Sequence, residues 1–137
     1  MRAVLDPNVV ISALLSPNGA PARVLLAWRA GAFELLVSPQ LLAELRRALS
    51  YPKLRDRIDS QDAASLVDWL TRFATLATDT RHAPTRSADK GDDYLIALAA
   101  STDALLVSGD KHVLALAEEF PVVSPARFLE LIEPSVG

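Results

Sequence analysis

Residues 2–15 read RAVLDPNVVISALL and begin an alternation of strands and helices that continues along the chain. Arg2–Leu5 is short and mostly apolar, which predicts a buried strand, and Asp6 follows it directly. A second apolar run, Val9–Leu15, is broken by the turn-forming residues Ser16–Gly19. The first predicted strand of the chain therefore ends in a carboxylate.

Further strands and helices are predicted in the same alternating order. The predicted strands are short apolar runs, which is typical of a parallel sheet covered by helices on both faces. We therefore predict an α/β fold with three layers, a central and mainly parallel sheet, and one domain over residues 1–137. The strands are expected at Phe33–Val37, Ala74–Ala77, Ala104–Val107 and Val122–Val123, and the helices at Ala22–Ala30, Gln40–Leu49, Ala63–Phe73, Tyr94–Ala100, Val113–Glu118 and Ala126–Ile132.

Local signals indicate where several of these helices begin or end. Gly31 is expected to end the helix before it, because glycine is favoured just past a helix C-terminus. Ser38 and Ser124 each precede a proline and are expected to cap the helices that follow them.

Aromatic residues at helical spacing with leucines favour core or interface positions over base stacking. This pattern describes Trp28, Trp69 and Phe73. In the helix predicted at 63–73, Leu66, Leu70 and Phe73 are expected to face inward, with Trp69 beside them.

The composition restricts which kind of metal site is possible. The chain has 137 residues, a net charge of −3 and no cysteine, so disulfides and thiolate metal sites are excluded. Carboxylates, carbonyl oxygens and two histidines remain as ligands, which favours a hard, oxygen-bound cation. The acidic balance argues against nucleic-acid binding by electrostatics alone, unless the acids are gathered to hold cations.

No apolar stretch approaches the roughly 20 residues of a membrane span. Asp6 also interrupts any apolar run before a signal peptide could form. We therefore expect a cytoplasmic protein that makes no contact with membranes.

Acidic residues fall where predicted strands end or predicted helices begin. In open parallel sheets, ligands bind beyond the carboxyl ends of the strands, so we expect these acids to share one rim of the sheet. Their mutual repulsion would destabilise the fold without a compensating cation, and a hard divalent metal supplies that compensation. The acids are Asp6, Asp92 or Asp93, Asp110 and, inside the helix that follows the second strand, Glu44.

Each acid also has an ordinary structural explanation. A strand-ending aspartate such as Asp6 or Asp110 often only caps a loop. Asp92 or Asp93 can serve as a helix N-cap, and Glu44 can be a solvated helix residue. The coincidence of all four, rather than any one of them, indicates a metal site.

Four segments around these acids resemble the motifs of PIN-domain nucleases, in particular the VapC-like toxin components of bacterial toxin–antitoxin pairs. They occur in order and cover nearly the whole chain. The segments are VLDPNVVISALL at residues 4–15, SPQLLAEL at 38–45, GDDYLIALA at 91–99 and LVSGDKH at 106–112. Pro7 departs from the pattern, since the family usually has a threonine there, and it removes a hydroxyl and a backbone N–H near Asp6.

The resemblance implies an endoribonuclease that hydrolyses RNA phosphodiester bonds with the help of Mg²⁺ or Mn²⁺. It also implies a small antitoxin protein as a partner and a homodimer. The implied catalytic residues are Asp6, Glu44, Asp93 and Asp110, the implied metal ligands are Asp6, Asp92, Asp93 and Asp110, and the implied supporting residues are Asn8 and Ser108.

RNA needs a positively charged approach even when the catalytic site is acidic. Arg46 and Arg47 belong to the main basic concentration of the chain, and Lys111 follows the fourth acid. These three are candidates for RNA binding, although a solvated surface is the alternative reading.

Two other functions compete with the ribonuclease. One is a structure-specific DNA nuclease, although such enzymes usually carry more acids and extra helices. The other is a non-catalytic domain of the same fold that binds RNA or a partner, for which Pro7 is the only support. A phosphatase of the haloacid-dehalogenase kind is disfavoured, because it needs a second aspartate where this chain has Asn8.

Overall fold

The computed structural model describes residues 1–79 and 93–133 and consists there of a parallel sheet and helices on both sides of it. The sheet has five strands in the order β3-β2-β1-β4-β5, and all four pairings are parallel. The strands are β1 (Arg2–Leu5), β2 (Glu34–Val37), β3 (Thr75–Leu76), β4 (Leu105–Val107) and β5 (Val122–Val123). The helices are α1 (Pro7–Leu15), α2 (Ala20–Arg29), α3 (Pro39–Leu49), α4 (Pro52–Arg55), α5 (Ser60–Phe73), α6 (Asp93–Ser101), α7 (Lys111–Leu114) and α8 (Pro125–Ile132).

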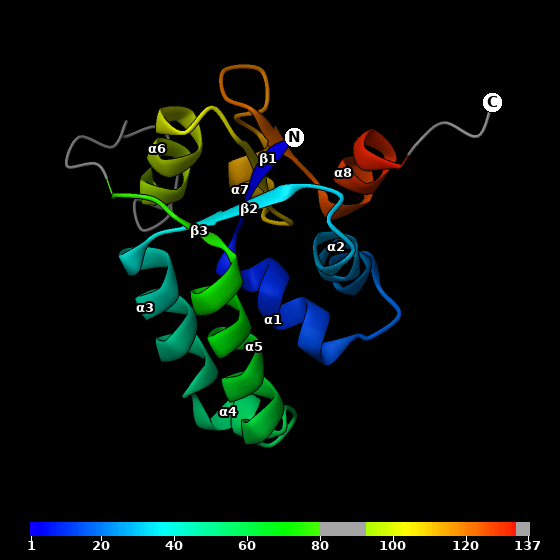
Figure 1. Ribbon diagram of the computed structural model, residues 1–137, viewed down its shortest axis with the longest axis vertical. Coiled ribbons are helices and arrows are strands. Elements are labelled where there is room, and N and C mark those ends of the chain that lie inside the picture. The colour runs from blue at the N-terminus through cyan, green and yellow to red at the C-terminus, as the bar shows by residue number, and fades with distance from the viewer. Residues whose placement is uncertain (80–92, 134–137) are drawn as a thin grey trace.

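The sheet crosses the middle of the molecule, with α1, α3 and α5 below it and α6 above it (Figure 1). The helices α3, α4 and α5 together extend away from the sheet as a lobe, which we call the lower lobe. The central strands are almost completely buried, because helices cover both of their faces. This arrangement confirms the predicted three-layer α/β fold.

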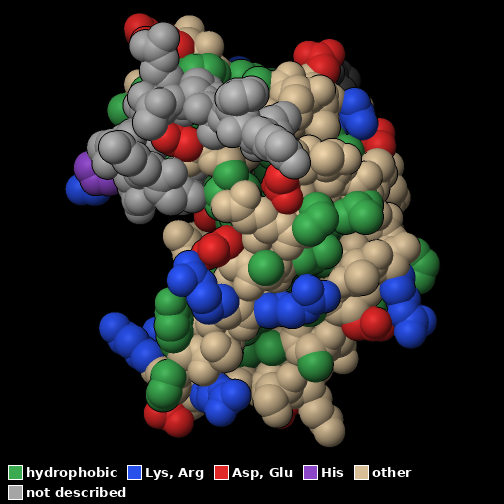
Figure 2. Space-filling view, turned by 90° about the vertical axis from the view of Figure 1, so that its left-hand side faces the viewer, with side chains coloured by type: hydrophobic (Ala, Val, Ile, Leu, Met, Phe, Trp, Pro, Cys, Tyr) green, Lys and Arg blue, Asp and Glu red, His purple; other side chains and the backbone are tan. Residues whose placement is uncertain are grey.

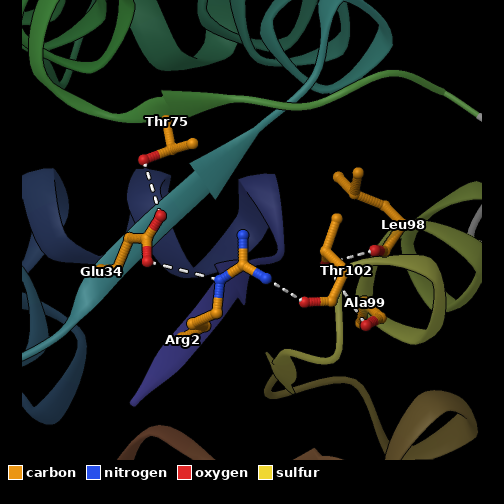
Figure 3. A network of polar contacts seen from close by, with 6 residues as sticks. All are labelled: Arg2, Glu34, Thr75, Leu98, Ala99 and Thr102. Carbon is orange, nitrogen blue, oxygen red and sulfur yellow. Dashed lines mark hydrogen bonds and ion pairs between the residues drawn. The ribbon is translucent and has the colours of Figure 1, made fainter.

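Polar contacts connect the strands at the edge where they begin. Arg2 forms an ion pair with Glu34 at an N–O distance of 3.3 Å, and its guanidinium donates to the carbonyl of Thr102 (Figure 3). The Thr75 hydroxyl donates to the other oxygen of Glu34 at 3.0 Å. The network therefore links β1, β2, β3 and the connection from α6 to β4, at the opposite end of the strands from Asp6.

The predicted helix ends are confirmed at several positions. Gly31 follows α2 with a φ of +83°, the left-handed conformation that glycine adopts most easily. The Ser38 and Ser124 hydroxyls accept hydrogen bonds from the first turns of α3 and α8. The run 9–15 is helical, and the polar stretch 51–57 contains the short helix α4.

Two predictions about elements were wrong. The helix expected at Val113–Glu118 begins instead at Lys111, because Asp110 caps it, and it ends at Leu114. A series of hydrogen-bonded turns then leads toward β5. Phe73 was expected to face inward, but 61% of it is exposed. Val67 and Leu70 form the buried side of α5, while Phe73 stacks on Trp69 and Trp69 packs edge-on against Trp28.

Among the described residues, none of the helices alone has the length and apolar character needed to cross a membrane. The helices α1 and α2 meet the length and composition test only as a pair, and they are bent by 102° relative to each other.

Candidate functional site

Asp6 lies at the end of β1 and begins α1, so one residue joins the sheet to the first helix. Its backbone N–H donates to the carbonyl of Val107 in β4 at 3.0 Å, which holds the end of β1 against β4. One carboxylate oxygen accepts the backbone N–H of Asn8 at 3.0 Å, as an N-cap does. Asp6 is only 2% exposed, so the strand and the helix together bury an acidic group.

Pro7 occupies the first position of α1. The N–H group at this position has no partner inside a helix, so proline costs the helix nothing there. The substitution that sets this chain apart from the usual motif is therefore compatible with the local structure around Asp6.

Ser108 connects the two acids that follow neighbouring strands. Its side chain is fully buried, and its hydroxyl donates to the second carboxylate oxygen of Asp6 at 2.9 Å. The same hydroxyl accepts the backbone N–H of Asp110 at 3.1 Å. The loop after β4 is thereby connected to the end of β1 through a single side chain.

Asp110 caps α7, since one of its carboxylate oxygens accepts the backbone N–H of His112 at 2.8 Å. Asp110 is partly exposed, whereas Asp6 is buried. The two carboxylates are close enough for the charge of Asp110 to act on Asp6.

The pKa of Asp6 is raised, mainly because burial disfavours its charged form. The hydrogen bonds from Asn8 and Ser108 oppose this effect, and the negative charge of Asp110 adds to it. The net effect is a raised pKa, so the site disfavours the charged carboxylate of Asp6, and a neighbouring positive charge would offset this cost.

Asp93 is the first residue of α6, which packs against β1 and β4, and only 5% of it is exposed. It lies at the start of the helix, as predicted for an acid that helps to form the rim. Asp92 precedes it and lies outside the described residues.

Glu44 lies on α3 and forms an ion pair with Arg47 on the same helix. Its hydrogen bond to the guanidinium and its charge raise the pKa of Arg47, and Tyr51 and Tyr94 contribute as well.

The donor groups suit a hard cation, since all of them are oxygens and Asp6 is a buried carboxylate beside a second acid. Across residues 1–79 and 93–133, however, no three His, Asp or Glu side chains lie close enough together to hold a metal ion. The structure thus joins Asp6 and Asp110 through Ser108, and it does not bring Asp93 or Glu44 into one metal-binding group with them.

A cavity of about 310 Å³ opens at Asp110, the more exposed member of the acidic pair, whereas the buried Asp6 does not line it. Its lining includes Asp110, Asn8 and two residues to which the sequence analysis assigned no role, Ser12 and Gly109. Ser12 lies four residues after Asn8, so helical spacing on α1 could have identified it. The cavity leaves room for a substrate group next to the acidic edge.

Basic residues occupy the neighbouring surface. Figure 2 shows Lys and Arg side chains gathered over the lower half of the face that carries α3, where the lower lobe extends from the sheet. Arg46 and Arg47 on α3 and Lys111 on α7 are all exposed. Of these three candidates for RNA binding, Arg47 is already paired with Glu44.

Known proteins are similar to this chain in sequence or in fold. The uncharacterized protein MJ1680 of Methanocaldococcus jannaschii is 28% identical over an alignment that covers 100% of this chain and 95% of the relative. The VapBC2 structure from Rickettsia felis, bound to a DNA fragment from its promoter, aligns with a TM-score of 0.64 at 14% identity, over 90% of this chain and 98% of that one. PAE2754 from Pyrobaculum aerophilum aligns with a TM-score of 0.65 at 16% identity, over 96% of this chain and 89% of that one.

The two solved structures, at such low identity, establish the fold alone. The family model of the PIN domain matches residues 2–112, which include the segments around Asp6, Glu44, Asp93 and Asp110. PIN domains are generally nucleases. The match spans well over half of the sequence, and the chain belongs to the PIN domain family.

Proposed function

We propose that this chain is a Mg²⁺- or Mn²⁺-dependent endoribonuclease that acts as the toxin of a toxin–antitoxin pair. The observation that carries the proposal is the buried carboxylate of Asp6, connected by Ser108 to a second acid, Asp110. A buried acid with a raised pKa next to another acid costs stability unless a cation binds there. Such a pair at the carboxyl ends of parallel strands is what a metal-assisted hydrolase requires.

Each acid has a distinct part in this proposal. Asp6 and Asp110 would hold the metal ion, Asp93 or Asp92 would complete its coordination once the ion draws the acids together, and Glu44 would orient a water molecule. A bound divalent cation supplies acidity to its water and stabilises negative charge on the phosphate. Asn8 and Ser108 hold the Asp6 carboxylate in place by the hydrogen bonds described above.

Contacts with RNA are assigned to the basic surface of the lower lobe and to α7. Arg46, Arg47 and Lys111 bind phosphates of the RNA backbone. The net charge of −3 makes a local basic surface necessary, because the protein as a whole would repel RNA.

The partner proteins are also proposals. One solved structure with the same fold is a VapBC complex, which favours a small antitoxin that inhibits this chain. A homodimer and a cytoplasmic location follow from the same assignment. Size-exclusion chromatography with light scattering of the purified chain tests the dimer, and co-purification with the product of an adjacent short gene tests the antitoxin.

The decisive experiment is a cleavage assay on labelled single-stranded RNA, with Mg²⁺, with Mn²⁺ and with EDTA. Asp6→Asn removes the charge at nearly constant volume and is expected to abolish cleavage. Glu130→Gln on α8 is the matched control, because Glu130 is exposed and pairs with Arg127 on the same helix. Metal-dependent cleavage by the wild type and the control, without cleavage by Asp6→Asn, supports the proposal.

The same assay separates the competing functions. A DNA strand of the same sequence that is cut faster than RNA would favour the DNA nuclease. Isothermal titration with Mn²⁺ provides the other distinction. Metal binding without cleavage of either strand would favour the non-catalytic binding module, whereas absence of metal binding would refute the role given to Asp6 and Asp110.

A further inference from the structure

A second cavity lies in the lower lobe, between α3, α4 and α5, and shares none of its lining residues with the cavity beside the acidic pair. Its volume is about 510 Å³, within the roughly 300–1,000 Å³ of small-molecule sites. Much of its wall is apolar, including Leu49, Ile58 and Val67. Ile58 and Val67 are buried members of the core, so the floor of the cavity is a fixed part of the fold.

Two arginines line this apolar cavity, and neither has a charged partner among the described residues. Arg46 on α3 and Arg55 on α4 both line it and are exposed, and neither forms an ion pair with any residue of 1–79 or 93–133. The neighbouring Arg47 and Arg72 differ, because each is paired with an acid on its own helix. Two unpaired guanidinium groups beside one cavity favour an anionic ligand.

The one acid that lines the cavity does not cancel this charge. Asp68 forms an ion pair with Arg72 at 3.1 Å, so the pair together is neutral. The cavity therefore keeps the positive charge of Arg46 and Arg55. An acceptor oxygen of Asp68 remains available to an N–H donor of a ligand, because a carboxylate has several acceptor positions.

We infer that this cavity binds one nucleotide of the RNA strand at a distance from the cleaved bond, an inference that rests on the proposed function. The apolar floor accepts the flat face of a base, and Arg46 and Arg55 bind the phosphate. Asp68 accepts a hydrogen bond from the base. A flat apolar group joined to a phosphate is the ligand that matches an apolar wall, two free guanidinium groups and one acceptor.

The position of the cavity suits a strand that also reaches the acidic site. The helix α3 begins directly after β2, at the edge of the sheet where Asp6 lies, and Arg46 is eight residues beyond Ser38. At 1.5 Å per residue, Arg46 lies about 12 Å along the helix from that edge. The basic surface in Figure 2 covers the same half of the molecule, so one strand can contact both places.

Binding rather than cleavage tests the inference. A fluorescein-labelled six-nucleotide RNA is titrated with the Asp6→Asn protein in EDTA, and anisotropy gives the Kd. Two variants in this background change the cavity: Arg46→Ala combined with Arg55→Ala, and Ala64→Trp, which fills the cavity from an exposed lining position. Thermal unfolding shows whether each variant is folded.

Matched control variants change the same properties elsewhere. Arg23→Ala combined with Arg127→Ala removes two exposed arginines, on α2 and α8, and Ala100→Trp adds the same bulk at an exposed position of α6. The double arginine variant is expected to raise Kd about tenfold or more, since a hydrogen bond to a charged group is worth about that factor. Ala64→Trp is expected to raise Kd as well, because its indole takes the space of the base. The control variants are expected to change Kd less than about twofold.

Competition identifies what the cavity holds. Adenosine monophosphate at millimolar concentration is expected to displace the labelled RNA, and adenosine or inorganic phosphate alone is expected to displace it much less. Equal loss of binding in cavity and control variants would show general charge attraction and overturn the inference. Unchanged binding in the folded cavity variants, or failure of the nucleotide to compete, would overturn it as well.

This result is independent of the cleavage assay. Nucleotide binding that depends on Arg46 and Arg55 stands even if no RNA is cut, because the experiment uses EDTA and a variant without the Asp6 charge. The converse outcome is that the chain cuts RNA while the cavity variants bind RNA as tightly as their parent. That result would leave the nuclease proposal intact and overturn the nucleotide site.

Discussion

Replacing Ser108 by alanine tests the connection between the two acids most directly. The hydroxyl is fully buried and makes two hydrogen bonds, one to a carboxylate oxygen of Asp6 and one from the N–H of Asp110. Loss of a hydrogen bond to a charged, buried group costs about 1.5–3 kcal/mol. The Asp110 N–H is only partly buried and can turn to water, so it adds at most about 1 kcal/mol. We expect Ser108→Ala to lower the free energy of unfolding by about 1.5–4 kcal/mol.

Urea unfolding at neutral pH in EDTA measures this change. Ser50→Ala is the control, because the Ser50 hydroxyl makes a single exposed hydrogen bond to a backbone carbonyl. It is expected to change the free energy of unfolding by no more than about 0.5 kcal/mol. A loss below about 1 kcal/mol for Ser108→Ala would refute the view that this hydroxyl stabilises the buried carboxylate.

A double-mutant cycle with Asp6→Asn isolates the charge. A hydrogen bond between neutral groups is worth about 1 kcal/mol, roughly half of one to a charged group. Ser108→Ala should therefore cost about 1 kcal/mol less in the Asp6→Asn protein than in the wild type. Equal costs in the two backgrounds would mean that the hydroxyl does not act through the Asp6 charge.

Three further predictions concern pH, metal and the core. Burial raises the pKa of Asp6 above its ordinary value of 3.8, so the folded protein keeps a proton that the unfolded chain has lost. In EDTA the free energy of unfolding of the wild type should thus fall relative to that of Asp6→Asn as pH rises from about 4 through the folded pKa. A difference in unfolding free energy that does not change with pH would contradict this. Mn²⁺ at about 100 times its Kd should stabilise the wild type by about 2.7 kcal/mol in thermal unfolding but leave Asp6→Asn unchanged. Phe128 is fully buried with its ring 4.8 Å from that of Phe33, so Phe128→Ala should cost about 3–5 kcal/mol in urea, against less than about 1 kcal/mol for the exposed Leu131→Ala.

Replacing Glu44 by glutamine tests whether this acid of α3 takes part in the reaction. It is partly exposed and paired with Arg47, so Glu44→Gln should leave thermal unfolding nearly unchanged. If Glu44 orients water in the site, the same variant should cut RNA about 10- to 100-fold more slowly than the wild type. Cleavage at the wild-type rate would restrict Glu44 to its surface ion pair.

Short-range signals predicted the parts of the fold that depend on neighbouring residues. The apolar run before Asp6 is a strand, Gly31 ends a helix, and Ser38 caps one, because each of these features is decided within about four residues. The alternation of strands and helices was sufficient to predict the three-layer class, since short apolar strands need cover on both faces. The order of the strands in the sheet could be seen only in the structure, because it depends on which distant segments pair.

The side-chain environments were harder to predict than the elements. Helical spacing suggested that Phe73 faces inward, yet the buried side of α5 is formed by Val67 and Leu70, because the packing of α5 against its neighbours decides which side of it is covered. In the same way, the motif around Glu44 was recognised in the sequence, but its pairing with Arg47 was not.

The amino-acid sequence was enough to predict the fold class and the acids that follow strands, because strand ends and helix caps are local properties of the chain. The link from Asp6 to Asp110 through Ser108 became visible in the tertiary structure, since Ser108 and Asp6 are 102 positions apart along the chain. It also decided that Arg46 and Arg55 share a cavity with an apolar floor. Both arrangements depend on how β1, β4 and the lower lobe pack, and packing brings together groups whose spacing along the chain carries no signal of their contact.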